Sequence, residues 1–133
     1  MNLKPFKPIP TSINRLSHEI LDSAYNVHSA LGPGLLENIY ELFLVQGLQK
    51  KGLKVKHQVS FDIELEGFKV DGGLRLDLLV EDQIIVEIKA VESILPIHHA
   101  QLLTYLKLTK RPLGLLINFN VVSLKQGIKR IVL

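Results

Sequence analysis

The hydrophobic period of the chain changes near Gly52, and this change constrains the fold more than any other feature. Before that point apolar residues recur every three or four positions, which predicts two amphipathic helices. Their apolar positions are Leu16, Ile20, Ala24, Val27 and Leu31, then Leu36, Ile39, Tyr40, Phe43, Leu44 and Leu48. From Val55 to Leu65 every second position instead belongs to an apolar series, as in a half-buried strand. A chain that forms helices first and strands afterwards is expected to pack the helices onto a sheet.

Short local signals predict where the two helices begin and end. We expect Ser17 to be the N-cap of the first helix and the Gly-Pro-Gly sequence at 32–34 to end it. Gly52 is placed to end the second helix in a left-handed conformation. The three prolines of residues 1–11 predict a flexible lead-in, and residues 12–133 are long enough for a single domain.

The rest of the chain is predicted to form four more strands and one helix. Turns at 66–67 and 81–83 connect the next two strands to the first, which predicts an antiparallel meander with a bend at Gly72-Gly73. The helix is apolar nearly all round, so we expect it to pack against the sheet. These segments are Phe68–Val80, Ile84–Ala90, the helix from Pro96 to about Leu108, Leu113–Phe119 and Ile128–Leu133. The predicted order is ααβββαββ, an α/β fold with a mixed sheet of about five strands flanked by helices.

Composition excludes several classes of function. The chain has no cysteine, which rules out disulfides, thiolate metal sites and cysteine nucleophiles. No apolar run reaches the roughly 18 residues that a membrane span needs, and the first ten residues lack the apolar core of a signal peptide. We therefore expect a cytoplasmic protein without a membrane partner. Aromatic residues are only 6% of the chain, which disfavours single-strand binding by base stacking.

Three charged residues stand in strands that are otherwise almost entirely apolar. They are Asp77 in the second strand and Glu87 and Lys89 in the third. A charge in such a strand costs several kcal/mol unless it is paired, hydrogen-bonded or bound to a metal. One reading is an ion pair that only sets the strand register, and the other is a functional site.

The turn between these strands decides their geometry. A three-residue turn at 81–83 places Asp77 opposite Glu87, with Cβ atoms about 4.5–5.5 Å apart, whereas a two-residue turn would break the pairing. Lys89 would point to the same face as Glu87. Two adjacent carboxylates repel each other unless a cation lies between them, and hard oxygen ligands favour Mg²⁺ or Mn²⁺. The lysine could then orient water or stabilise charge on a phosphate.

The same residues resemble a known signature. Asp77 followed by Glu87-Ile88-Lys89 resembles the D…ExK motif of the PD-(D/E)XK phosphodiesterases. Gln101 and Tyr105 are similar to the QxxxY motif of RecB-like members. The segment GLLENIY at 34–40 resembles the signature of the small bacterial GxxExxY proteins, which are assigned to that superfamily.

This resemblance implies a restriction-endonuclease-like fold and metal-dependent hydrolysis of phosphodiester bonds in DNA or RNA. It implies Asp77, Glu87 and Glu37 as metal ligands for Mg²⁺ or Mn²⁺ and Lys89 as the residue that assists the attacking water. One departure is Leu76, where the family often has proline. Two other functions remain open: a catalytically silent nucleic-acid-binding module, and a homodimeric interaction module with the same fold.

Four further residues are candidates for substrate binding: Gln101, Tyr105, His98 and Tyr40. Each also has a purely structural interpretation. The tyrosines could be core rings with a hydrogen-bonded hydroxyl, and Gln101 could bridge helix and sheet. His98 and its neighbour His99 point about 100° apart on a helix, so at most one of them can face the site. Glu37 could likewise be a solvated residue at a helix edge.

Overall fold

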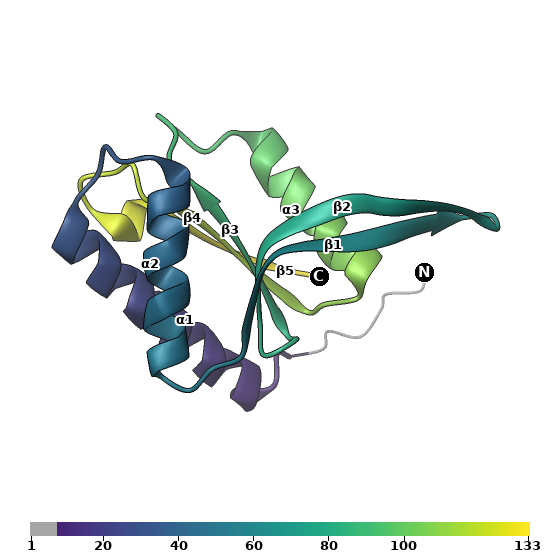
Figure 1. Ribbon diagram of the computed structural model, residues 1–133, viewed down its shortest axis with the longest axis horizontal. Helices are drawn as coiled ribbons and strands as arrows, with labels where there is room; N and C mark the ends of the chain where they lie inside the picture. Colours follow the sequence, from purple (N-terminus) through teal and green to yellow (C-terminus); the bar gives the residue numbers. More distant parts are fainter. Residues whose placement is uncertain (1–7) are drawn as a thin grey trace.

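A computed structural model describes residues 8–133 and confirms the predicted order of elements (Figure 1). The helices are α1 (Thr11–Leu31), α2 (Glu37–Lys50) and α3 (Pro96–Thr109). The strands are β1 (Val55–Leu65), β2 (Phe68–Val80), β3 (Ile84–Lys89), β4 (Leu113–Asn118) and β5 (Ile128–Val132). A short 3-10 helix, η1 (Leu124–Gly127), precedes β5 and was not predicted. No helix among the described residues is both long and apolar enough to cross a membrane.

The strands form one five-stranded sheet in the order β1-β2-β3-β4-β5. β3 and β4 run parallel, and every other neighbouring pair is antiparallel, so the sheet is mixed as predicted. The parallel pair requires a crossover, which α3 supplies. The predicted meander of β1, β2 and β3 is also confirmed.

Helices cover the sheet on both faces. In Figure 1, α1 and α2 lie to the left of the sheet and α3 lies to its right. Alternate residues of β3 enter different cores, since Ile84 and Val86 pack with α1 and α2 while Ile85 packs with α3. β3 and β4 are therefore buried on both faces, which explains why their sequences are almost continuously apolar.

The start of α1 corrects one expectation. The helix begins at Thr11 after Pro10, and Ser17 is a buried residue inside the helix and not its N-cap. Proline suits the position before the helix, because its ring restricts φ to values near the −54° observed for Pro10. Residues 1–7 of the predicted lead-in lie outside the described residues, while Ile9 packs against the core.

The packing of α3 confirms the expected contact with the sheet, which the helix makes through one stripe of residues. Its buried residues are Leu102, Leu106 and Thr109, which form a single stripe toward the sheet. Leu103 and Leu108 lie on other sides of the helix and are exposed. A helix that has a sheet on one side only cannot bury apolar residues placed all round it.

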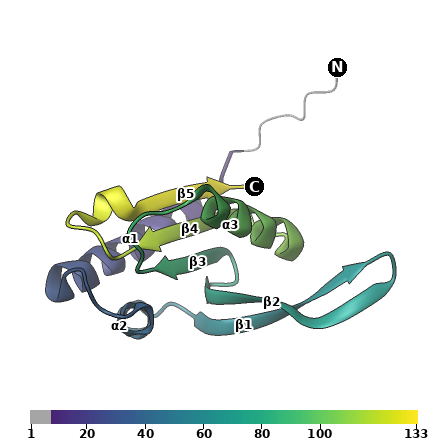
Figure 2. The same cartoon turned by 90° about the horizontal axis from the view of Figure 1, so that it is seen from above.

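β1 and β2 continue as a long hairpin beyond the body of the sheet (Figures 1 and 2). The apolar side of the hairpin changes face where the two parts meet. The regular pairing of β1 with β2 omits Gln58, whose φ of 52° is left-handed. On β2, Leu78 packs with α1 and α2, whereas Leu76 packs with α3. The uniform alternation predicted for residues 55–65 is therefore wrong at Gln58, because one left-handed residue turns the strand over.

The distal part of this hairpin, residues 61–73, is called the arm below. The pairing register shifts between Phe61 and Ile63, opposite the predicted bend at Gly72-Gly73. A Cβ atom on Gly73 would lie 2.8 Å from the side chain of Ile63, so the close approach requires glycine.

Candidate active site

The candidate site lies where β2 and β3 separate, at the carboxyl end of β3 and near the first residues of α2 and α3 (Figure 1). The predicted three-residue turn at 81–83 is present, and the ladder above it pairs Val80 with Ile84 and Leu78 with Val86. Regular pairing ends there. The next two residues in this register are Asp77 and Glu87.

Side chains replace the backbone ladder at this point. The Asp77 N–H donates to Oε2 of Glu87 at 2.8 Å, and the Ile88 N–H donates to Oδ2 of Asp77 at 2.8 Å. Each carboxylate therefore reaches across to the backbone of the opposite strand. The arrangement brings the two acidic groups into one gap between the strands.

Glu87 is an unusual carboxylate because it is only 5% exposed. Its burial, followed by the nearby charge of Asp77, raises the pKa of Glu87 to about 8. The bond from the Asp77 N–H and the positive charge of Lys89 oppose this increase in the pKa. A cation beside Glu87 would favour its ionised form, so the site is chemically suited to positive charge.

Glu37 and Lys89 lie within electrostatic range of the same gap. Burial and the charge of Asp77 raise the pKa of Glu37, while Lys89 and the backbone of Ala90 lower it. Glu37 is the first residue of α2, and its carboxylate lies close enough to the backbone of Ala90, just after β3, for that backbone to lower its pKa. The structure thus places the four residues predicted as the catalytic group, Glu37, Asp77, Glu87 and Lys89, within electrostatic range of one another.

Tyr105 borders this group from α3, on the face of the sheet to which Ile85 and, by strand alternation, Glu87 and Lys89 point. Burial raises the pKa of its hydroxyl, and the charges of Glu87 and then Asp77 raise it further. Its ring packs at the edge of the core beneath α3. Gln101 lies one helical turn before Tyr105 and is exposed to solvent.

Comparison with known proteins identifies the fold family. A profile of the PD-(D/E)XK nuclease superfamily matches residues 14–131, nearly the whole chain. The chain belongs to this superfamily. Its fold is similar to the crystal structure of SSO0001, with a TM-score of 0.53 and 24% sequence identity over 91% of this chain. The chain spans 59% of the length of SSO0001. No curated protein matches the sequence.

Members of the PD-(D/E)XK superfamily are expected to bind a divalent metal. The question is therefore whether the carboxylate oxygens of this site suit such an ion. Within residues 8–133, no three histidine, aspartate or glutamate side chains form a ready-made metal cluster. The chemistry of the pair nevertheless fits a hard cation. Oε2 of Glu87 and Oδ2 of Asp77 are bonded to backbone N–H groups, and the described residues provide no donor for the other carboxylate oxygens. Because no buried polar side-chain atom of the described residues lacks a partner, those other oxygens are open to solvent.

Tyr40, the last residue of the GLLENIY segment at 34–40, is part of the hydrophobic core. Its ring is fully buried and stacks on Phe119 with 4.6 Å between ring centroids. Its hydroxyl donates to the Gly32 carbonyl at 2.6 Å and accepts the Leu35 N–H at 3.0 Å. A side chain buried in this way has no surface for the predicted substrate contact. Tyr40 instead ties the loop before α2, and with it the start of the helix at Glu37, to the core.

His98 also supports a helix start. Its Nδ1 accepts the Leu95 N–H at 3.0 Å, which closes the first turn of α3. This bond explains the histidine without any substrate. Its side chain is partly exposed, and a contact with substrate through the other ring nitrogen stays a prediction.

Sequence reasoning missed a second buried carboxylate one turn after Glu37. Glu41 is 7% exposed, and Nε2 of Gln58 donates to both of its oxygens, at 2.8 and 3.0 Å. Gln58 stands opposite Asp77 in the β1–β2 register, at the point where the strand turns over. A glutamate between the apolar residues Tyr40 and Leu44 was the available signal, because it breaks the buried face of α2 just as Asp77 breaks β2.

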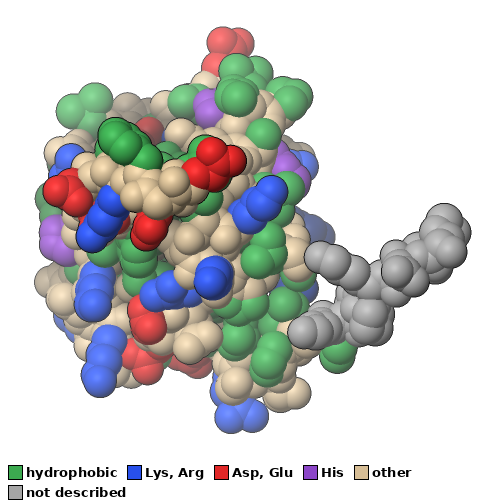
Figure 3. Space-filling view, turned by 90° about the vertical axis from the view of Figure 1, so that its right-hand side faces the viewer, with side chains coloured by type: hydrophobic (Ala, Val, Ile, Leu, Met, Phe, Trp, Pro, Cys, Tyr) green, Lys and Arg blue, Asp and Glu red, His purple; other side chains and the backbone are tan. Residues whose placement is uncertain are grey.

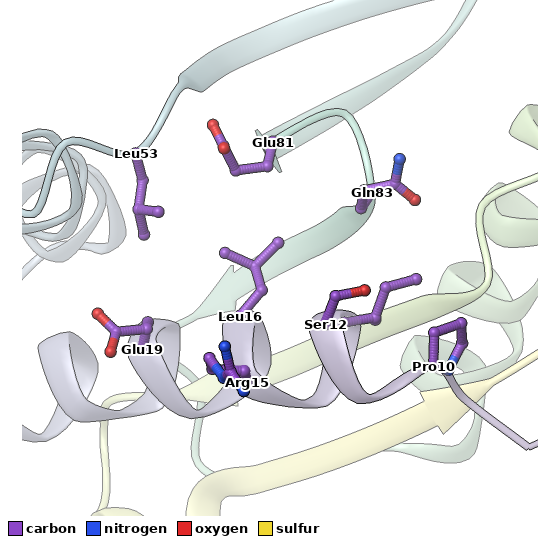
Figure 4. Close-up of a pocket in the computed structure, with 9 residues that line it drawn as sticks. Pro10, Ser12, Arg15, Leu16, Glu19, Leu53, Glu81 and Gln83 are labelled. Atoms are coloured by element: carbon purple, nitrogen blue, oxygen red, sulfur yellow. The ribbon is translucent and has the colours of Figure 1, made fainter.

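A hollow of about 610 Å³ lies away from this site, at the other end of β3 (Figure 4). It is bounded by the first half of α1 and by Leu53, Glu81 and Gln83. Glu81 is already engaged there, since its Oε2 accepts the Lys54 N–H at 2.7 Å. None of the predicted site residues lines this hollow, so we do not assign the chemistry to it.

Proposed function

We propose that the protein is a metal-dependent nuclease that hydrolyses phosphodiester bonds in DNA or RNA. The observation that carries the proposal is the pair Asp77 and Glu87, which replaces two backbone bonds of the β2–β3 ladder with carboxylates. A purely structural strand pair has no need of this exchange, because backbone bonds would serve without burying charge.

Asp77, Glu87 and Glu37 would hold Mg²⁺ or Mn²⁺ through carboxylate oxygens. Such an ion would act as a Lewis acid on a phosphate oxygen and would lower the pKa of a bound water. Lys89 provides a fixed positive charge beside the carboxylates, suited to orienting water or neutralising a phosphate oxygen. Tyr105 and Gln101 stand on α3 where a nucleic-acid strand would pass the site.

The local structure also supports assignment to the GxxExxY group. Gly34 has a φ of 101°, so the loop before α2 needs glycine there. Tyr40 ties the same loop to the core through its hydroxyl. Between them, Glu37 opens α2 and lies within range of Asp77. Together, Gly34 and Tyr40 would therefore hold Glu37 near the gap between β2 and β3.

Metal titration with a matched aspartate control tests the proposal. We expect calorimetry at pH 8 to detect Mn²⁺ binding that Asp77→Asn weakens at least tenfold. Asp82→Asn is the control, because Asp82 belongs to the turn of the same hairpin and is exposed. Wild type should also cleave labelled DNA or RNA only when the metal is present.

The outcomes separate the competing functions. Equal metal binding by wild type and Asp77→Asn would refute the site. Metal-dependent nucleic-acid binding without cleavage of single-stranded or double-stranded DNA or RNA would establish the silent binding module instead.

A further inference from the structure

The arm presents an apolar surface that the protein itself does not cover. Leu65 and Phe68 are each 74% exposed and Val70 is 47% exposed. At the base of the same side, Phe61 and Ile63 pack into the core beneath α3. The apolar side of the arm therefore begins in the core and continues into solvent, and the arm projects beyond α3 (Figures 1 and 2).

An isolated two-stranded hairpin is at best marginally stable in water. The arm ends in a tight turn in which Glu66 and Gly67 both have positive φ, at 51° and 81°. Such a turn suits a hairpin but needs no large apolar residues on both sides of it. Leu65 and Phe68, which pair across the turn, are best explained by a surface that covers them.

The charge of the arm identifies the kind of partner. Residues 61–73 contain four acidic residues, Asp62, Glu64, Glu66 and Asp71, and one basic residue, Lys69, for a net charge of −3. This charge repels a nucleic-acid backbone, so the partner is a protein surface. The whole chain carries +3, so the rest of it carries +6 and is complementary to its own arm.

The outer side of α3 has matching properties. Ile97 is 67% exposed and Leu108 is 46% exposed, and helical geometry places both on the side away from the sheet. Lys107 and Lys110 stand near Leu108, in the last turn of the helix and at its end. Within residues 8–133, neither these lysines nor the arm's Glu64 and Glu66 form an ion pair. Figure 3, seen from the side toward which the arm projects, shows hydrophobic, acidic and basic side chains together on this face.

We propose that the arm of one protomer packs on the outer side of α3 of a second copy, in a two-fold dimer. Because both surfaces belong to one protomer, a two-fold rotation forms the contact twice. Taking roughly 200 Å² for a fully exposed large apolar residue, the five apolar residues offer on the order of 600 Å² per protomer. A standard interface buries about 800 Å² per partner.

Sedimentation velocity over a range of protein concentrations tests the dimer. Phe68→Ser should weaken self-association at least tenfold, because a central aromatic residue is removed from the contact. Val122→Ser is the control, because Val122 is 92% exposed and lies outside the arm and α3. That variant should associate as wild type does.

A charge exchange tests which surfaces meet. Reversing Glu64 and Glu66 to lysine should weaken the dimer at least fivefold, and so should reversing Lys107 and Lys110 to glutamate. A chain that carries all four reversals should dimerise nearly as well as wild type, since each contact again joins opposite charges. If the two-residue reversals weakened the dimer only by unfolding the protein, combining them would not restore it.

Either a monomeric wild type or a dimer that responds differently to the variants would overturn the proposal. The monomer is tested at about 100 μM, roughly a hundred times a micromolar Kd. A monomer whose arm is nevertheless protected from hydrogen exchange would show that the same chain covers it, with residues 1–7 as the segment to delete. A dimer that Phe68→Ser leaves unchanged, or one that the four reversals fail to restore, would place the interface elsewhere.

Discussion

The two ends of the β2–β3 hairpin are built from the same strands but follow opposite rules. At the closed end, Val80 and Ile84 pair through the backbone beside the turn, and both are fully buried and apolar. At the open end, Asp77 and Glu87 hold the strands together with carboxylates. The distance between these ends is only a few residues.

This difference would let one hairpin combine stability with the proposed active site. Apolar packing and backbone bonds at the closed end stabilise the pair and set its register. The register then delivers two acidic groups to the open end, where burial and the charge of Asp77 raise the pKa of Glu87 to about 8. We expect substitutions at the closed end to affect folding and substitutions at the open end to affect chemistry.

The largest expected effect is at the open end, on catalysis. Lys89→Met keeps the length of the side chain but removes its charge, so the site loses its fixed cation. We expect cleavage to fall by about 10²- to 10⁴-fold while the affinity for Mn²⁺ changes little. Single-turnover cleavage and calorimetry measure the two quantities separately.

Lys129→Met is the matched control for that experiment, because Lys129 is an exposed lysine on β5. It should cleave at the wild-type rate. Equal cleavage by Lys89→Met and wild type would mean that the lysine has no part in the reaction.

The next effect is at the closed end, on stability. Ile85 is fully buried beneath α3, so Ile85→Ala should lower the free energy of unfolding by about 2–5 kcal/mol. Ile85→Val should lower it by only about 0.5–1.5 kcal/mol. Urea denaturation measures both losses.

Metal binding by the folded Ile85→Ala protein should match wild type if the two ends are independent. A tenfold loss of Mn²⁺ affinity in this variant would instead show that packing at the closed end holds the carboxylates in place.

Much of this hairpin could be predicted from the sequence, because its signals are local. Asp77, Glu87 and Lys89 are conspicuous as charges in apolar strands, and three turn residues fix their register. The breaks at Gly32 and Gly52 likewise mark helix ends, because both adopt positive φ. Backbone preferences act over a few residues, so a sequence pattern can reveal them.

Other features could not be predicted, because they depend on contacts between distant segments. Glu41 and Gln58 meet across α2 and β1, and the left-handed backbone of Gln58 has no local signal such as glycine. The exposure of Leu103 and Leu108 depends on how much of α3 the sheet covers. Tertiary contacts decide these cases.

A third prediction concerns pH at the open end. The pKa of Glu87 is about 8 in the folded protein and near 4.5 when unfolded. Folding therefore favours the protonated form, so the contribution of Glu87 is full below pH 4.5 and is lost as pH rises to about 8. A tenfold difference in proton affinity between the folded and unfolded protein corresponds to about 1.4 kcal/mol, so the total loss is on the order of a few kcal/mol.

Glu87→Gln resembles the protonated residue and should remove this loss. In EDTA it should unfold like wild type at pH 4.5 and be more stable by a few kcal/mol at pH 8.5, as urea denaturation would show. Added Mn²⁺ should stabilise wild type at pH 8.5 and leave the variant unchanged. A constant difference between the two proteins from pH 4.5 to 8.5 would contradict the raised pKa.

The smallest expected effect is at the closed end, at Asp82, whose contribution to stability depends on pH in the opposite direction to that of Glu87. The bond from Arg111 to Asp82, at 2.7 Å, lowers the pKa of this exposed carboxyl. Its contribution is therefore present above the ordinary aspartate pKa and is lost as pH falls through the lowered folded value, the reverse of Glu87. Asp82→Asn should lower the melting temperature slightly at pH 7, less so in 1 M NaCl, and not at all at pH 2. A deficit of Asp82→Asn that shrank as pH rose from 4.5 to 8.5 would contradict the opposite pH dependence of the two ends.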